Sequence, residues 1–340
     1  MPGPHDLLVR YTFSAPERAE AELRAALPAH VVAAVDWSSL KQEPGSVVDE
    51  ELRETETDLL FSARLRTGST LLVYVLLEHQ SSVDRNMALR MLRYVVRQVE
   101  RWGQEHPERE GLPVIIPLVM YHGTGGAWTA PRRVEELFEV PEQERGLWHA
   151  LVPRFEYLLD DLTAKKAEAL LARPGPPLVR LAWLALRYGR TEELAERMPD
   201  WVALFAEVYA ASDGTENLGV VIRYLVHVGD KTVRRVARRV LHSVMDAQRA
   251  EELMKSYGEE LIERGRKRGL QQGLQQGLQQ GRLQERAETV LRILAARGIR
   301  VGDEARQRIL TCTDGALLDR WVDRALNATT LSSVLDDPTQ

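Results

Sequence analysis

Two carboxylates and an amide stand at the ends of two neighbouring apolar runs. The stretch TDLLFSARLRTGSTLLVYVLLEHQSS has Asp58 at the start of the first run, and Glu78 and Gln80 at the end of the second. Residues 58–66 and 70–80 are rich in Leu, Val, Phe and Tyr, which predicts two strands. The Thr-Gly-Ser between them predicts a three-residue hairpin loop, with Gly available for a left-handed position.

In that hairpin Arg66 faces Thr70, and the register places Asp58 opposite Glu78. Directly opposed residues share a face of a sheet, and Gln80 shares it with Glu78 because side chains alternate with period two. A two-residue loop would move Asp58 to the other face. The geometry therefore predicts that all three side chains gather on one face, at one end of the strand pair.

A pair of close carboxylates has a chemical consequence. The two groups repel each other, and one takes up a proton unless a cation lies between them. Mg²⁺ accepts one or two carboxylates together with phosphate oxygens, and such a metal lowers the pKa of a bound water. The alternative is that two charged strand ends simply reach solvent.

The elements around the hairpin indicate an α/β fold. Apolar spacing predicts helices over 15–27 and 84–102, and LPVIIPLVMYHG at 112–123 predicts a buried strand. The order helix, strands, helix, strand is typical of an α/β sandwich. After about residue 155 only helices are predicted, among them PPLVRLAWLALRYG, DWVALFAEVYAAS and KTVRRVARRVLHSVM.

Four motifs carry a family resemblance over roughly residues 5–123: HDLLVRYTFS, VDEELRETETDLLF, YVLLEHQSSVDRNMALRMLRYVV and PVIIPLVMYHG. With them the sequence resembles the PD-(D/E)XK nuclease superfamily and, more closely, the recombination-promoting nuclease (putative transposase) family of bacteria. The resemblance implies a restriction-endonuclease-like core of helix, three-stranded meander, helix and strand. It also implies a DNA endonuclease that uses Mg²⁺ (or Mn²⁺), bound by Asp58, Glu78 and the backbone carbonyl of His79.

Gln80 stands where the superfamily usually has a lysine. A lysine can stabilise charge on a phosphate or orient the attacking water, whereas a neutral amide only donates and accepts hydrogen bonds. Activity is therefore expected to be weak, or absent. His5 and Asp6 match the opening motif of the family, as a helix cap or as catalytic groups, and Glu20 is either an extra acid or an exposed helix residue.

Basic residues predict where DNA would bind. Arg93, Arg97 and Arg101 recur every four residues after Gln80 and form one stripe, which either neutralises phosphates or is a solvated helix face. The predicted DNA-binding residues are Arg90, Arg93, Arg97 and Tyr94, with a core role open for Tyr94. A second candidate phosphate surface, which could equally be a helix-packing face, consists of Arg234, Arg235, Arg238 and Arg239. No pattern indicates base recognition, so low sequence specificity is expected.

Composition limits the class of protein. The 340 residues include 44% hydrophobic residues, and the net charge of −5 means that any nucleic-acid contact depends on local basic patches. The single cysteine, Cys312, excludes an internal disulfide and a cysteine-rich zinc site. The sequence has no signal-peptide pattern and no apolar run of membrane-spanning length. A soluble cytoplasmic protein without a membrane role is expected.

Five glycines at Gly265, Gly269, Gly273, Gly277 and Gly281 punctuate a GLQQ repeat. It is either a semi-flexible spacer or a helix through which two copies associate. The expected division is a nuclease-like domain at 1–155, a helical extension at 156–260, the repeat helix or linker at 261–284, and a small helical C-terminal domain at 285–340.

The sequence as a whole predicts a metal-dependent DNA endonuclease of low sequence specificity, associated with recombination or mobile elements. The alternative is a catalytically weak or inactive nuclease-fold protein that binds DNA or another protein.

Overall fold

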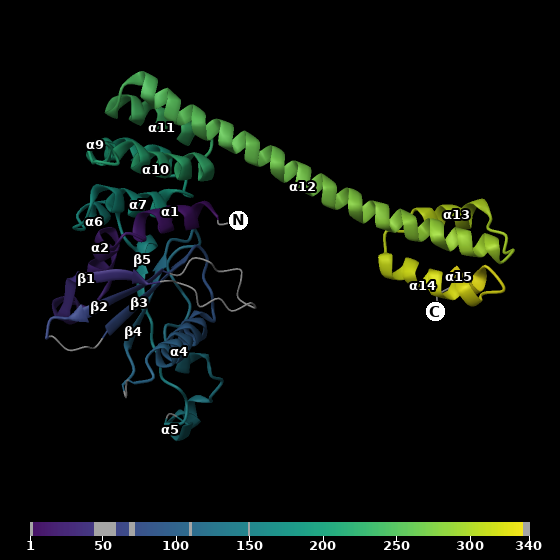
Figure 1. Cartoon of the computed structure of the whole chain (residues 1–340), viewed down its shortest axis with the longest axis horizontal. Helices are drawn as coiled ribbons and strands as arrows, with labels where there is room; N and C mark the ends of the chain where they lie inside the picture. The colour runs from purple at the N-terminus through teal and green to yellow at the C-terminus, as the bar shows by residue number, and fades with distance from the viewer. Residues whose placement is uncertain (1–2, 44–58, 68–71, 109–110, 149, 336–340) are drawn as a thin grey trace. The chain divides into compact units, whose positions relative to one another are not determined.

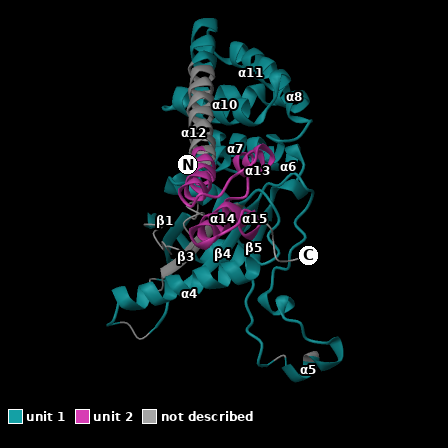
Figure 2. Ribbon diagram, turned by 90° about the vertical axis from the view of Figure 1, so that its right-hand side faces the viewer, with its two compact units in different colours: residues 1–257 teal, residues 258–340 magenta. Residues whose placement is uncertain are grey.

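The computed structural model describes residues 3–43, 59–67, 72–108, 111–148 and 150–335 (Figure 1). The side chains of residues 72–79, Arg145 and residues 256–280 are outside this description. The chain divides into two compact units, residues 1–257 and residues 258–340 (Figure 2). Each unit contains a hydrophobic core of its own.

A five-stranded sheet lies in the first unit, with the strand order β1-β2-β3-β4-β5. The strands are β1 (Val35–Glu43), β2 (Leu59–Leu65), β3 (Leu72–Gln80), β4 (Val114–Tyr121) and β5 (Leu158–Asp161). The first three form an antiparallel meander, whereas β4 and β5 run parallel to β3. The expected α/β fold is confirmed, and the elements follow the order helix, three-stranded meander, helix, strand.

The β2–β3 hairpin has the register that a three-residue loop predicts. Leu59 pairs with Leu77, and the pairing continues without a shift to Arg64 opposite Leu72. Because the register is continuous, alternate residues along both strands lie on the same face of the sheet.

Helix α4 (Met87–Glu105) covers one face of the sheet (Figure 2). Its buried residues Met91 and Tyr94 pack with Leu60 of β2, Val119 of β4 and Tyr157, which precedes β5. This is the helix predicted over residues 84–102. It begins later than predicted because the residues that follow β3 first form a turn.

Helices α1 (Pro4–Phe13), α2 (Pro16–Ala26) and α7 (Pro177–Tyr188) lie on the opposite side of the sheet from α4 (Figure 1). Short helix α3 (Ala29–Ala34) leads into β1. Phe61, Leu118 and Met120 alternate with the α4 face along their strands and are fully buried. The sheet is therefore covered on both faces, as the almost wholly apolar β3 predicts.

The described elements after β5 are all helices, which confirms the prediction that the later part of the chain is helical. Up to residue 244 they are η4 (Leu162–Ala164), α6 (Ala167–Leu171), α7, α8 (Leu194–Arg197), η5 (Met198–Trp201), α9 (Val202–Tyr209), α10 (Gly214–Val228) and α11 (Lys231–Val244). α7 is buried around most of its circumference because α1, α6, α9 and α10 all contact it.

Two strands were not predicted from the residues. β5 lies after residue 155, where the sequence indicates only helices, and four residues are too few to show a strand period. β1 carries polar residues at several positions, which hides its alternation. Between β4 and β5 an excursion contains η2 (Val134–Leu137), η3 (Glu142–Glu144) and α5 (Arg145–Trp148), and it projects from the first unit (Figure 2).

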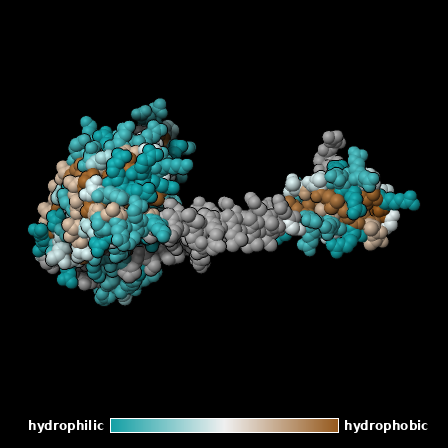
Figure 3. Space-filling model, turned by 90° about the horizontal axis from the view of Figure 1, so that it is seen from above, coloured by the Kyte–Doolittle hydropathy of each residue, from teal (hydrophilic) through white to brown (hydrophobic). Residues whose placement is uncertain are grey.

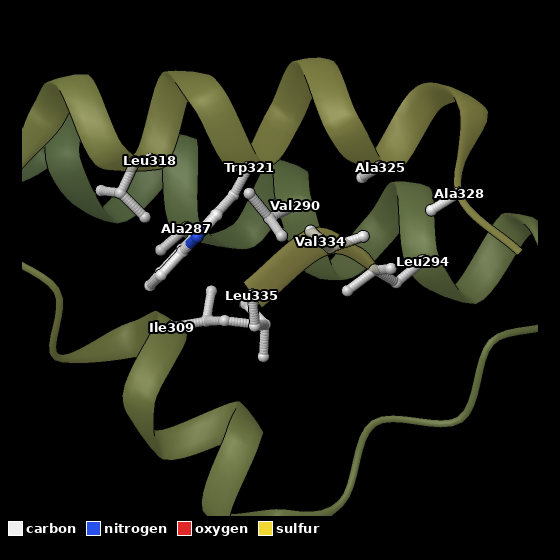
Figure 4. Close-up of a cluster of buried hydrophobic side chains, with 10 residues drawn as sticks. All are labelled: Ala287, Val290, Leu294, Ile309, Leu318, Trp321, Ala325, Ala328, Val334 and Leu335. Atoms are coloured by element: carbon white, nitrogen blue, oxygen red, sulfur yellow. The ribbon is translucent and has the colours of Figure 1, made fainter. Parts of the chain in front are cut away.

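The GLQQ repeat is helical. It lies within α12 (Ala247–Ala296), which runs for 50 residues and ends in the second unit. That unit also contains α13 (Asp303–Leu310), α14 (Gly315–Asn327) and α15 (Ser332–Leu335). Trp321 of α14 is the largest side chain in its core, between the end of α12 and α13 (Figure 4). An apolar strip is visible on the surface of the second unit (Figure 3).

None of the helices, as far as the structure describes their residues, combines the length and the apolar character that a membrane span requires.

Candidate functional site

The carboxyl ends of β3, β4 and β5 meet at one edge of the sheet because these strands are parallel. Gln80, Tyr121 and Asp161 are paired in register across this carboxyl edge. The backbone N–H of His122 donates to the carbonyl oxygen of Gln80 over 2.9 Å. Gln80 itself is half-buried. The main chain at this candidate residue is thus fixed by the neighbouring strand.

Glu78 pairs with Val119, whose side chain is buried beneath α4. Since paired residues share a face, positions 78 and 80 of β3 belong to the face that α4 covers. Asp58 directly precedes β2 and lies outside the described residues, and the side chains of Glu78 and His79 also lie outside them. Their predicted roles as metal ligands remain predictions.

The predicted DNA-binding residues all lie on α4, in different surroundings. Arg90 forms an ion pair with Asp84 over 3.2 Å and is held beside the turn after β3. Arg93 is exposed and Arg97 is half-buried. Tyr94 is only 8% exposed and packs in the core under the helix, the role that the sequence left open for it.

A cluster of aromatic and basic side chains lies near the carboxyl edge, and sequence reasoning did not find it. The hydroxyl of Tyr224 in α10 is 3.0 Å from Nδ1 of His5 in α1, and the rings of His5 and His122 are 4.9 Å apart. Burial raises the pKa of Tyr224, so this phenol keeps its proton. Arg190 donates to the carbonyl oxygens of Ser81 and His122 over 3.1 and 3.5 Å.

The cluster connects the helical extension to the ends of β3 and β4. The opening HDLLVRYTFS motif contains His5 and the PVIIPLVMYHG motif contains His122, but neither motif indicates that the two residues meet. Asp6 caps the first helix, because the backbone N–H of Gly3 donates to its carboxylate over 2.5 Å. Glu20 forms an exposed ion pair with Arg24, which is a surface role.

A buried charge network lies on the α2 side of β5. Arg173 binds both oxygens of Asp160 over 2.8 Å, and the indole of Trp183 donates to Glu22 over 2.6 Å. Glu22 is fully buried. Burial, and then the nearby Asp160 carboxylate, raise the pKa of Glu22 to about 8, so this acid is protonated at neutral pH.

The second candidate phosphate surface lies on α11. Arg234 donates to the carbonyl oxygen of Val226, and Arg238 forms an ion pair with Glu251 over 3.2 Å. Arg235 and Arg239 are exposed. Two of the four arginines, Arg234 and Arg238, are therefore engaged in contacts within the protein.

Within the described part of the chain, no three His, Cys, Asp or Glu side chains come close enough to hold a metal ion. Asp161 lies at the carboxyl edge, but it accepts hydrogen bonds from the backbone N–H groups of Trp128 and Thr163, which gives it a structural role. The predicted metal ligands are Asp58, Glu78 and the backbone carbonyl of His79.

The structure defines an α/β protein with an antiparallel meander, and the carboxyl ends of its parallel strands β3, β4 and β5 meet at one edge of the sheet. Residues 3–216 match the family described as putative transposase, YhgA-like. The chain belongs to this family.

The chain is also similar to individual members of the recombination-promoting nucleases. It is 33% identical to recombination-promoting nuclease RpnD of Escherichia coli O157:H7 over 171 residues, which cover 49% of this chain and 65% of RpnD. It is 28% identical to recombination-promoting nuclease RpnA of Escherichia coli K12 over 229 residues, 67% of this chain and 73% of RpnA. It is 29% identical to the inactive recombination-promoting nuclease-like protein RpnE of the same strain over 161 residues, 47% of this chain and 51% of RpnE. No solved structure matches the chain.

Proposed function

We propose that this protein is a metal-dependent DNA endonuclease of low sequence specificity, linked to recombination or mobile elements, with a PD-(D/E)XK core. The names of RpnD and RpnA support the nuclease class and the link to recombination. The order of elements, helix, antiparallel meander, helix and parallel strand, supports the core.

The observation that carries the proposal is the register of the β2–β3 hairpin. Leu59 pairs with Leu77, so one further step of the same register would pair Asp58 with Glu78. Glu78 occupies the same face as Gln80 by alternation. The three residues selected from the sequence would then meet at the carboxyl edge, on the side of the sheet that α4 covers.

The donor set fits a hard divalent cation. Two carboxylates and the backbone carbonyl of His79 supply only oxygen, which Mg²⁺ and Mn²⁺ prefer. When bound, such an ion supplies a more acidic water and stabilises charge at phosphorus. Asp58 and Glu78 would hold it.

The remaining candidate residues would contact the attacking water or the DNA rather than the metal. The amide of Gln80 would orient the attacking water by hydrogen bonds, without the charge that a lysine brings. Arg93 and Arg97, one turn apart on α4, would neutralise phosphates of the strand lying across the edge. Arg90, which forms an ion pair with Asp84, would contact a phosphate beside the turn after β3.

The second candidate is a nuclease-fold protein without cleavage activity that binds DNA or another protein. Two observations favour it: Gln80 replaces the usual lysine, and RpnE, a relative of similar identity, is named inactive.

Purified full-length protein incubated with supercoiled plasmid and Mg²⁺ or Mn²⁺ tests the proposal. Wild type should nick or linearise the plasmid, and Asp58→Ala or Glu78→Ala should abolish cleavage because each removes a metal ligand. Glu17→Ala, at an exposed position of α2, is the matched control and should cleave at the wild-type rate. Cleavage by either site variant at the wild-type rate would refute the site. A folded wild type that binds DNA without cutting it supports the second candidate.

A further inference from the structure

A basic hollow of about 490 Å³ lies beyond the end of β5 in the first unit. Its cationic lining residues are Lys165, Lys166, Arg187 and Arg197, and its acidic ones are Glu168 and Glu193. The sequence did not single out any of these residues, because they come from two separate stretches of the chain that only the fold brings together.

The basic hollow is at the same edge of the sheet as the candidate site. The chain passes from Asp161, in register with Gln80 through β4, directly into η4 and then into Lys165 and Lys166. Neighbouring strands are about 4.8 Å apart, so two strand spacings separate Gln80 from Asp161, about 10 Å.

The opposite wall of the basic hollow is also anchored to the candidate site. Arg187 and Tyr188 form the last turn of α7. Arg190, just beyond them, donates to the carbonyl oxygen of Ser81, the residue that follows Gln80. The end of α7 is thereby tied to the end of β3.

The charges of the basic hollow are not balanced. Glu193 is engaged by Arg197 over 3.2 Å. Lys165 lies 3.6 Å from Asp160, whose two oxygens already bind Arg173. One buried carboxylate is therefore shared by two cations.

Lys166 and Arg187 carry the remaining positive charge. Among the described residues no carboxylate pairs with either of them. Lys166 is exposed, and the guanidinium of Arg187 lies over the ring of Tyr188, 4.7 Å from its centroid, while its Nε donates to the carbonyl of Lys165 over 3.4 Å. A stacked guanidinium is held in one orientation and presents its remaining N–H groups to an anion.

We propose that the basic hollow binds backbone phosphates of the nucleic acid whose strand reaches the candidate site, with Lys166 and Arg187 as the main contacts. The inference rests on the proposed function, since it extends the DNA-binding surface from α4 around the carboxyl edge to α7. A lysine supplies a mobile point charge and an arginine a fixed fork, and both contact phosphate without reading sequence.

Binding of a short fluorescent duplex of mixed sequence to the full chain, with divalent metal chelated to prevent cleavage, measures the contribution of the basic hollow. The double variant Lys166→Gln, Arg187→Gln should lower the slope of log K against log salt by about 2, because each phosphate contact contributes about 0.9. The weakening should be the same for duplexes of different sequence.

The matched control removes one lysine and one arginine that lie outside every candidate phosphate surface. Lys231→Gln with Arg64→Gln changes two exposed residues and should leave the slope unchanged. Equal losses in both double variants would overturn the proposal, since they would show a dependence on net charge alone. Lys166→Gln with Arg187→Lys should regain about one unit of slope, and thermal unfolding of each variant checks the fold.

A competition with pyrophosphate separates a nucleic-acid backbone from a small phosphate compound. Pyrophosphate should displace the duplex only at concentrations that act through ionic strength; micromolar displacement that the double variant abolishes would refute the backbone assignment. If wild type binds duplex and the double variant binds with an unchanged slope, this inference fails while the proposed function stands. If wild type neither binds nor cleaves DNA, both fail.

Discussion

Glu22 is a fully buried acid whose pKa differs between the folded and unfolded chain. Burial, with a smaller contribution from the Asp160 carboxylate, raises its pKa from 4.5 to about 8. The folded protein therefore holds one more proton than the unfolded chain between these two values. By linkage, the free energy of unfolding decreases as the pH rises through this window.

Glu22→Gln should remove most of that decrease. The amide oxygen still accepts the hydrogen bond from Trp183, and no charge has to be buried at high pH. Between pH 5 and pH 8 wild type should lose on the order of 1–3 kcal/mol of stability through this group, at up to about 1.4 kcal/mol per pH unit. Urea unfolding of both proteins across the window measures it.

The control for this experiment is Glu20→Gln, which changes an acid two residues earlier in α2 that forms an exposed ion pair with Arg24. Its stability should depend on pH as that of wild type does. An unchanged pH dependence in Glu22→Gln would show that another group carries the proton.

The residues of the candidate site were accessible to sequence reasoning to different degrees. Asp58, Glu78 and Gln80 could be selected because polar residues at the end of an apolar strand are visible in the sequence. The meeting of His5, His122 and Tyr224 could not, because it depends on the packing of three elements that are far apart in the chain. The same is true of Lys166 and Arg187.

At the scale of elements, the hairpin was the most predictable part of the fold. The predicted length of its loop fixes the register, and the structure has that register. Strand β5 was not predictable, since its four residues gain their partners only by pairing with β4. Its position nevertheless sets where η4 and Lys165 lie at the carboxyl edge.

The basic face of α4 provides a prediction about the element that covers the proposed site. Arg93→Gln with Arg97→Gln should weaken duplex binding and lower its salt slope by about 2, because two phosphate contacts are lost. Folding should be preserved, since Arg93 is exposed and Arg97 only half-buried. Fluorescence anisotropy against salt measures the slope.

Glu100→Gln is the control of opposite sign on the same helix. It removes an exposed negative charge and should leave binding unchanged or strengthen it. An Arg93, Arg97 double variant with the wild-type salt slope would show that α4 presents only a solvated face.

At the scale of the whole molecule, the sheet, α4 and the basic hollow all belong to residues 1–257, and the family match ends at residue 216. The second unit has a separate core of its own, built around Trp321. Helix α12 contains six glycines, five of them in the repeat, and each interior glycine costs a helix about 1 kcal/mol relative to alanine. The repeat is therefore either a weakly stable helical spacer, or a helix whose small residues let a second helix approach closely.

Truncation after residue 260 separates these two roles of the repeat. The fragment 1–260 keeps every element that contributes to the proposed site, so it should cleave plasmid at close to the full-length rate. Its mass in solution, compared with that of the full chain, reports association: a change from dimer to monomer on truncation assigns self-association to residues 261–340, and an unchanged mass assigns a spacer. A folded 1–260 fragment without any cleavage would mean that the active form is the associated one. Restoring the pairing with an unrelated dimerising helix in place of the repeat should then restore cleavage.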